Sequence, residues 1–312
     1  MVMPKTAMLF TDQEAQSNGM GRDIAEAFPA AADVFARAND IVGYDLRKLC
    51  FEGPAEELEQ TNIQQPAIFT TSVAIWAALN NGAELDAAAM AGLSLGEYTA
   101  LHAAGSVSFE DALKLVKRRG ELMQEAATAT PSGMVTALGL DAEQCEKVCQ
   151  QASSIGIIQP ANFNCPSQVV LSGEKGACDA AVKLTEEAGG RAIPLKVAGA
   201  FHSAIMKPAA DGLSKVLEQT AFSSPRVPVL ANVNTNPHFD EKSIRQWLTD
   251  QLTSPVLWQA SIERLIREGI ERFVEIGPGR VLTGLMKKIS RGTPITNIST
   301  AGDLEQLTAS LA

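Results

Sequence analysis

The hydrophobic positions of this chain fall into short apolar runs separated by longer amphipathic stretches. Apolar residues spaced three and four positions apart predict helices, such as Arg22 to Asn39, and a strongly apolar helix from Pro66 to Leu79. Strands that alternate with helices favour a mainly parallel sheet covered by helices on both faces. The short apolar runs that predict buried strands are Ala7 to Phe10, Leu85 to Met90, Val227 to Val233 and Arg272 to Ile276.

The pattern changes between residues 130 and 198. There the predicted order is strand, helix, strand, strand, helix, strand, which is the order of a ferredoxin-like unit. We therefore predict an α/β fold in which a large hydrolase-like domain is formed by residues 1–129 and 199–312. Residues 130–198 form a small inserted ferredoxin-like α+β domain.

Composition and charge narrow the possible classes of protein. The chain has 312 residues, 46% of them hydrophobic, which is enough for a sizeable core, and no apolar run approaches the ~20 residues of a membrane span. A formal net charge of −10 argues against nucleic acid or an anionic membrane surface as a partner. The start of the chain resembles neither a secretory signal nor a transit segment, so we expect a cytoplasmic protein. The five cysteines show no metal-ligand spacing.

The run Gly92-Leu93-Ser94-Leu95-Gly96 is the strongest chemical motif. It lies between a predicted strand and a predicted helix, where a Gly-x-Ser-x-Gly turn is sharp and leaves its serine exposed as a nucleophile. The N-terminus of the following helix would favour an oxyanion beside Ser94. An ordinary glycine-rich turn is the alternative interpretation.

Arg119 interrupts the apolar face of the helix predicted from Ser108 to about Ala127. Leu115, Leu122 and Ala126 share its face. A buried guanidinium needs oxygen partners, because an unpaired buried charge is costly. Two hypotheses stay open: an internal salt bridge, or a bidentate clamp for an anionic substrate.

A serine nucleophile also needs a base to take its proton. The chain has three histidines. His102 lies on the predicted helix after Ser94, and His238 lies in a polar turn where we expect it to be solvated. His202 lies among small and apolar residues, either as a core histidine or as the base, and elimination makes it the best candidate base.

Several motifs occur in one order over nearly the whole chain, at residues 10–21, 92–98, 119–120, 162–173, 199–203, 251–258 and 275–279. Together they resemble the malonyl-CoA:acyl carrier protein transacylases. The resemblance implies a ping-pong transfer of a malonyl group from malonyl-CoA to the phosphopantetheine thiol of acyl carrier protein, supplying fatty acid or polyketide synthesis. It implies no metal or redox cofactor.

The resemblance also implies roles for individual residues. Ser94 would be the nucleophile and His202 the general base and acid, with the His202 ring oriented by a backbone carbonyl near Gln251. The backbone N–H groups of Gln13 and Leu95 would form the oxyanion hole. Arg119 would bind the free malonyl carboxylate, and Phe201 resembles the malonyl-selecting form of its motif.

Two positions depart from the family pattern. Leu93 replaces the usual histidine before the nucleophile, and Asp12 and Glu14 replace the glycines of the family's Gly-Gln-Gly-Ser-Gln loop. A carboxylate beside a developing oxyanion would raise its energy. We therefore expect either a loop geometry different from the family norm or side chains of Asp12 and Glu14 that face outward.

Two other functions remain possible at this point. A serine hydrolase or thioesterase would use the same nucleophile, although it would not explain Arg119 on an apolar face. A degenerate homologue that binds carrier protein without catalysis would explain the changes at Asp12, Glu14 and Leu93. The intact set of Ser94, Arg119 and His202 favours the transacylase.

Overall fold

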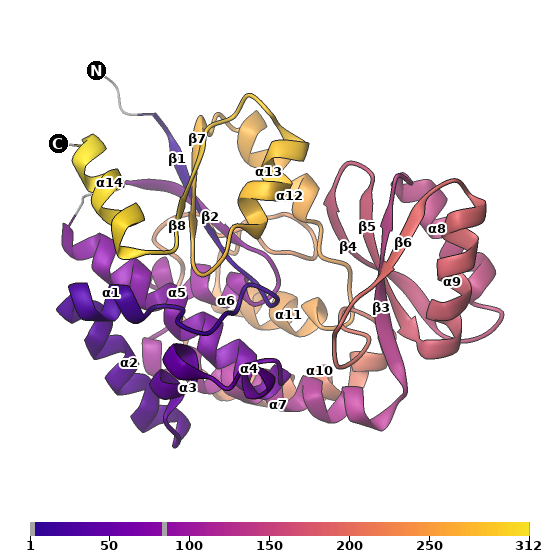
Figure 1. Ribbon diagram of the computed structural model, residues 1–312, viewed down its shortest axis with the longest axis horizontal. Coiled ribbons are helices and arrows are strands. Elements are labelled where there is room, and N and C mark those ends of the chain that lie inside the picture. Colours follow the sequence, from indigo (N-terminus) through magenta and orange to yellow (C-terminus); the bar gives the residue numbers. More distant parts are fainter. Residues whose placement is uncertain (1–3, 83–85, 312) are drawn as a thin grey trace.

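The computed structural model describes residues 4–82 and 86–311. Figure 1 shows two sheets in separate parts of the molecule, with the helices α1–α5 packed below the first sheet and the helices α8 and α9 against the outer side of the second. Leu85, the first residue of a predicted strand, lies outside the described residues, as do Met1, Val2 and Met3.

The first sheet contains four parallel strands in the order β2-β1-β7-β8. All five side chains of β1 are buried, because they alternate between two apolar layers. Met8 and Phe10 join the larger core and Ala7 and Leu9 the smaller one. The mainly parallel, doubly covered sheet predicted for the large domain is confirmed. Its strands are β1 (Thr6–Phe10), β2 (Ala87–Gly92), β7 (Arg272–Ile276) and β8 (Ile295–Ile298).

Helices enclose this sheet and carry most of the large core. The helices that precede the second sheet in the sequence are α1 (Arg22–Ala27), α2 (Pro29–Val42), α3 (Leu46–Glu52), α4 (Ala55–Leu58), α5 (Thr61–Gly82), α6 (Gly96–Ala103) and α7 (Phe109–Ala129). Those formed after it are the 3₁₀ helix η1 (Ala204–Met206), α10 (Lys207–Gln219), α11 (Glu241–Gln251), α12 (Trp258–Arg267), α13 (Val281–Ile289) and α14 (Ala301–Leu311).

The second sheet has four antiparallel strands in the order β4-β5-β3-β6. The predicted strand and helix order is confirmed by β3 (Ser132–Leu138), α8 (Ala142–Ala152), β4 (Ile158–Cys165), β5 (Gln168–Glu174), α9 (Lys175–Glu187) and β6 (Arg191–Pro194). A parallel bridge between Asn162 and Val256 ties β4 to the segment before α12. The exact domain boundaries after residues 129 and 198 stay a prediction.

Three local predictions were wrong. The helix predicted from Arg22 to Asn39 is interrupted at Phe28, whose extended backbone separates α1 from α2, because the residue before Pro29 disfavours the helical conformation. The run Val227 to Val233 forms only isolated bridges, of Val229 with Met90 and of Leu230 with Pro237, because the chain reverses there instead of continuing along β2. Helix α5 begins at Thr61 and contains Pro66 in its interior. The proline costs the helix a backbone hydrogen bond, but the extra turn aims Gln64 and Gln65 toward the centre of the molecule.

Candidate active site

Ser94 lies in the sharp turn between β2 and α6, as the sequence pattern predicts. Its backbone has a φ of 47°, in the left-handed region that non-glycine residues rarely adopt. The turn is possible because Gly92 and Gly96 lack side chains: a Cβ on Gly92 would overlap the carbonyl group of Gly96, and one on Gly96 would overlap the carbonyl oxygen of Phe10. Close backbone packing therefore holds Ser94 in a strained, fixed position.

His202 lies in the loop after the second sheet and meets Ser94 across 108 positions of sequence. Its Nε2 atom is 2.8 Å from the Ser94 Oγ, and its Nδ1 atom is 2.7 Å from the backbone carbonyl oxygen of Gln251. Since a carbonyl oxygen can only accept, Nδ1 carries the proton and Nε2 is free to accept one from Ser94. Burial and the nearby Arg119 charge lower the pKa of His202 to about 4, which keeps the ring neutral.

Arg119, on α7, is fully buried and points at the nucleophile. Its Nη2 donates to the Ser94 Oγ at 3.0 Å and to the Gln251 side-chain oxygen at 3.0 Å, while Nη1 donates to Gln65 at 2.7 Å. Its Nε has no hydrogen-bond partner, and no carboxylate within residues 4–82 and 86–311 forms an ion pair with it. The internal salt bridge considered from the sequence is therefore absent from the described chain, and the guanidinium beside Ser94 is paired only with neutral groups there.

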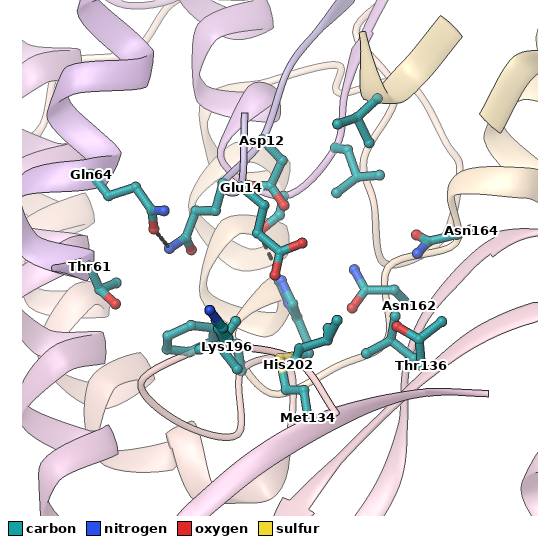
Figure 2. Close-up of a pocket in the computed structure, with 18 of the residues that line it drawn as sticks. Asp12, Glu14, Thr61, Gln64, Met134, Thr136, Asn162, Asn164, Lys196 and His202 are labelled. Atoms are coloured by element: carbon teal, nitrogen blue, oxygen red, sulfur yellow. Dashed lines mark hydrogen bonds between the residues drawn. The ribbon is translucent and has the colours of Figure 1, made fainter. Parts of the chain in front are cut away.

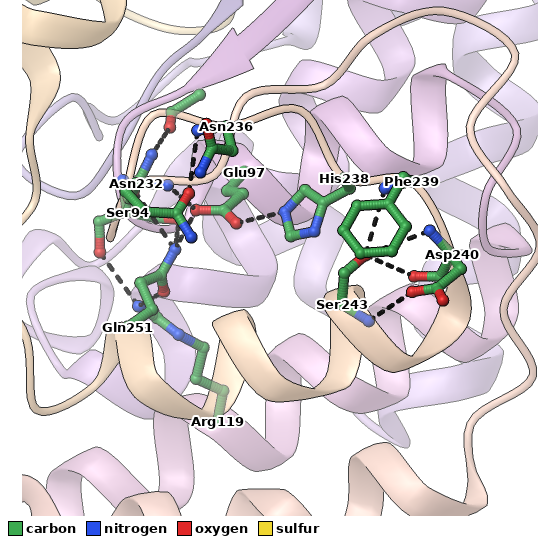
Figure 3. A network of polar contacts seen from close by, with 12 residues as sticks. Ser94, Glu97, Arg119, Asn232, Asn236, His238, Phe239, Asp240, Ser243 and Gln251 are labelled. Atoms are coloured by element: carbon green, nitrogen blue, oxygen red, sulfur yellow. Dashed lines mark hydrogen bonds and ion pairs between the residues drawn. The ribbon is translucent and has the colours of Figure 1, made fainter.

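A buried polar network supports these groups from behind (Figure 3). The Gln251 side-chain amide donates to the Ser94 carbonyl oxygen at 3.0 Å and to Glu97 at 2.8 Å. Glu97 also accepts from the Asn232 backbone at 2.9 Å and lies 2.7 Å from His238. The expectation that His238 is solvated was wrong: its side chain is fully buried, because Glu97 offers it a buried partner.

The loop after β1 places a carboxylate in the same centre (Figure 2). Asp12 accepts a hydrogen bond from the Leu95 N–H at 3.1 Å and another from the Gln13 N–H. Burial raises the pKa of Asp12 to about 7. Of the two alternatives expected from the sequence, the one in which both side chains face outward is wrong for Asp12, because backbone N–H groups hold its carboxylate inward, whereas Glu14 is exposed. Glu14 keeps a positive φ of 69°, and partial burial raises the pKa of its carboxyl group too.

A cleft of about 320 Å³ lies over Ser94 and His202. One wall comes from the first loop and α13. The opposite wall comes from Met134 and Asn162 of the second sheet and from Leu195, which follows it. Phe201 forms part of the wall beside His202 and is itself almost fully buried. The volume is at the lower end of the roughly 300–1,000 Å³ typical of small-molecule sites, so the cleft has room for a small ligand.

No cluster of three or more His, Cys, Asp or Glu side chains with metal-binding geometry occurs in residues 4–82 and 86–311. The five cysteines are buried and free, and burial raises the pKa of Cys50 and Cys149 to about 12, which makes their thiols poor nucleophiles. Within the same ranges, no helix combines the length and apolar character needed to cross a membrane.

Sequence reasoning missed the residues that position the site. Gln65, Asn232 and His238 touch the central groups but occur in segments without a recognisable motif. Glu97 carried a signal that could have been used, since it is a charged residue at the start of the apolar stretch Tyr98 to Ala104. A carboxylate in such a place needs buried donors, and here it has them.

Comparison with known proteins gives concordant matches. Residues 8–308 match the family model described as an acyl transferase domain. The chain is 44% identical over 291 residues to the malonyl CoA-acyl carrier protein transacylase of Bacillus subtilis, which covers 93% of this chain and 92% of the relative. It is 43% identical over 288 residues to the protein of the same name from Salmonella typhimurium, covering 92% and 93%.

Solved structures agree with these sequence matches. The malonyl CoA-acyl carrier protein transacylase of Coxiella burnetii superposes with a TM-score of 0.97 at 36% identity, over 100% of this chain and 99% of that one. A second match, with a TM-score of 0.96 and 41% identity over 98% and 99%, comes from a type II polyketide synthase acyl carrier protein in complex with its malonyl-transacylase.

Proposed function

Because the chain belongs to the acyl transferase family, and within it to the malonyl-CoA:acyl carrier protein transacylases, we propose that it moves a malonyl group from coenzyme A to the phosphopantetheine thiol of acyl carrier protein through an ester on Ser94. The observation that carries this proposal is that His202 and Arg119 both hydrogen-bond the Ser94 Oγ atom. Ser94 Oγ lies 2.8 Å from a neutral imidazole and 3.0 Å from a buried guanidinium that has no carboxylate partner in the described chain.

Acylation uses the hydrogen bond between Ser94 and His202. The Ser94 proton passes to Nε2 as Oγ bonds to the thioester carbonyl carbon. The Gln251 carbonyl holds Nδ1–H and stabilises the imidazolium that forms. Collapse of the tetrahedral intermediate breaks the carbon–sulfur bond, and His202 returns the proton to the departing coenzyme A thiol.

The second half repeats these steps in reverse order. The carrier-protein thiol gives its proton to His202 and attacks the malonyl ester, and the imidazolium then protonates the Ser94 oxygen as it leaves. The same base therefore serves both halves, as a ping-pong scheme requires. A coenzyme A thioester is a cytoplasmic metabolite, so the proposal includes the cytoplasmic location expected from the sequence.

Arg119 recognises the acyl group in this proposal. Two guanidinium N–H groups bind both oxygens of the free malonyl carboxylate, in the planar fork geometry that a carboxylate matches. Its present partners Gln65, Ser94 and Gln251 are neutral, so a carboxylate outcompetes them. Phe201, in the cleft wall, limits the room beside the acyl carbon and supports selection of malonyl over branched groups.

The backbone N–H groups of Gln13 and Leu95 bind the oxyanion of the tetrahedral intermediate. Support comes from their direction, since both converge on one oxygen-bearing group, the Asp12 carboxylate. Leu95 also stands at the N-terminus of α6, whose dipole favours negative charge.

Intact-protein mass spectrometry tests the proposal. The wild type and Ser94→Ala are mixed briefly with malonyl-CoA, and phosphopantetheinylated carrier protein is then added. We expect a single malonyl adduct on the wild type alone, followed by its transfer to the carrier. Release of free malonate with an unloaded carrier would instead identify a serine hydrolase. Carrier binding without any adduct would identify a non-catalytic homologue.

A further inference from the structure

The Asp12 carboxylate occupies the place where the proposed reaction develops negative charge. Its Oδ1 atom accepts a hydrogen bond from the Leu95 N–H at 3.1 Å, and the Gln13 N–H also hydrogen-bonds the carboxylate group. These are the two donors assigned above to the oxyanion. A carboxylate oxygen and a tetrahedral oxyanion demand the same donors and carry the same sign of charge, so both cannot be held there at once.

We propose that Asp12 is an internal occupant of the oxyanion hole, which must be protonated and give up the two N–H groups before Ser94 can be acylated. The inference rests on the proposed function. Protonation removes the charge that makes Asp12 a strong acceptor, and a neutral carboxyl group yields the donors to the thioester oxygen. The fraction of protein in which Asp12 is protonated therefore limits the rate of the first half-reaction.

The surroundings of Asp12 bring the pKa of its carboxyl group close to neutral pH. Withdrawal from water is the largest influence and raises the pKa, the N–H groups of Gln13 and Leu95 and the charge of Arg119 lower it, and the charge of Glu14 raises it. The balance is a pKa of about 7. The charged or titratable groups that share the cleft or face Asp12 are Glu14, Glu59, Arg119, Lys196 and His202.

Two opposing requirements then shape the pH dependence of acylation. His202 must be neutral to accept the Ser94 proton, which holds above its pKa of about 4. Asp12 must be protonated, which holds below its pKa of about 7. The acylation rate should therefore rise through pH 4, pass a maximum and fall above pH 7, by about tenfold for each further pH unit.

The test measures the rate of malonyl-Ser94 formation from malonyl-CoA between pH 5 and 9, by rapid quench and intact mass. This half-reaction contains no carrier thiol, whose own ionisation would overlap the descending limb. We expect the acylation rate of the wild type to fall above pH 7, and we expect this fall to be absent in Asp12→Asn and Asp12→Gly. One pH unit above the midpoint, each variant should be about tenfold faster than the wild type.

Glu14→Gln provides a matched control, since it removes a negative charge from the same loop without vacating the hole. Removing that charge lowers the pKa of Asp12, so the descending limb should move to lower pH. A wild-type profile that stays flat to pH 9, or a limb that persists in Asp12→Asn, would overturn the inference while leaving the transacylase intact. Absence of any adduct at every pH, in all variants with native circular dichroism, would instead overturn the proposed function.

Discussion

The Nδ1 atom of His202 lies 2.7 Å from the backbone carbonyl oxygen of Gln251. This hydrogen bond orients the ring and raises the pKa of the imidazole, but by less than burial and the Arg119 charge lower it, because a carbonyl carries no full charge. Together with burial and the Arg119 charge, this leaves the pKa of His202 at about 4. The hydrogen-bonded pair of Ser94 and His202 is thus oriented by a backbone carbonyl and not by a carboxylate.

The lowered pKa of His202 predicts a specific dependence of stability on pH. The unfolded chain binds a proton at His202 below pH 6.5, whereas the folded chain does so only below about 4. The free energy of unfolding should therefore fall as pH falls through this window, by about 3 kcal/mol from this group. Asp12 titrates in the opposite sense, so the comparison is with His202→Gln in urea denaturation at pH 4 and 7. An identical pH dependence in both proteins would contradict the prediction.

Arg119 should determine the preference for a free carboxylate. Arg119→Gln removes two charge-assisted hydrogen bonds, so kcat/KM for malonyl-CoA should fall by about 100-fold. The value for acetyl-CoA, which has no second carboxylate, should change by less than about tenfold. Arg119→Lys keeps the charge but lacks the planar fork of the guanidinium, so its kcat/KM for malonyl-CoA should lie between those of the wild type and Arg119→Gln. Equal losses for both substrates would indicate a structural role only.

The two glycines of the Ser94 turn should not tolerate a methyl group. In Gly96→Ala the new Cβ would overlap the carbonyl oxygen of Phe10, and we expect a loss of more than about 3 kcal/mol in the free energy of unfolding. Gly284→Ala is the control. It lies inside helix α13 with no heavy atom near its Cβ position, and should gain about 0.5–1 kcal/mol. Chemical denaturation of the two variants checks both signs.

The buried pair of Glu97 and His238 should contribute to stability and to positioning. Both side chains are fully buried, so His238→Ala leaves the Glu97 carboxylate short of a donor and should cost about 3–5 kcal/mol. Glu97→Gln combined with His238→Ala completes a double-mutant cycle. A coupling energy near zero would show that the two residues do not interact in solution.

Glu14 carries backbone strain that substitution can measure. Its φ of 69° costs a residue with a Cβ about 1 kcal/mol relative to glycine. Glu14→Gly and Glu14→Ala both remove the charge, so the difference between them reports the strain, less the unfolded-state entropy of glycine. We expect Glu14→Gly to melt at the higher temperature. The reverse order would place the loop in a different conformation.

Much of the fold followed from local patterns. The apolar run of β1 and the small residues of β2 predicted buried parallel strands, because a strand covered on both faces must be apolar throughout. The alternating order between residues 130 and 198 predicted the second sheet. The run Val227 to Val233 misled for the same reason: it is apolar and buried, but burial there follows from packing beside β2 and not from a ladder.

The residues of the candidate active site also differ in how far the sequence alone could identify them. Ser94 could be singled out because flanking glycines mark a sharp turn around it. Arg119 could be singled out because it is a charged residue on the apolar face of a predicted helix. His202 emerged only by elimination, and Gln65, Asn232 and His238 not at all. Their roles depend on contacts across 54 to 141 positions, such as Arg119 with Gln65 and His238 with Glu97.

Residue order alone was enough to specify the strand-to-helix turn, because glycine spacing and periodicity act within a few residues. Tertiary packing decided what surrounds that turn. It sent the Asp12 carboxylate inward, since two backbone N–H groups from separate segments converge there, and it left Arg119 without an acidic partner in the described chain. Local sequence sets backbone shape, whereas the partners of a buried charge are set by whichever distant segments the fold brings within hydrogen-bonding distance.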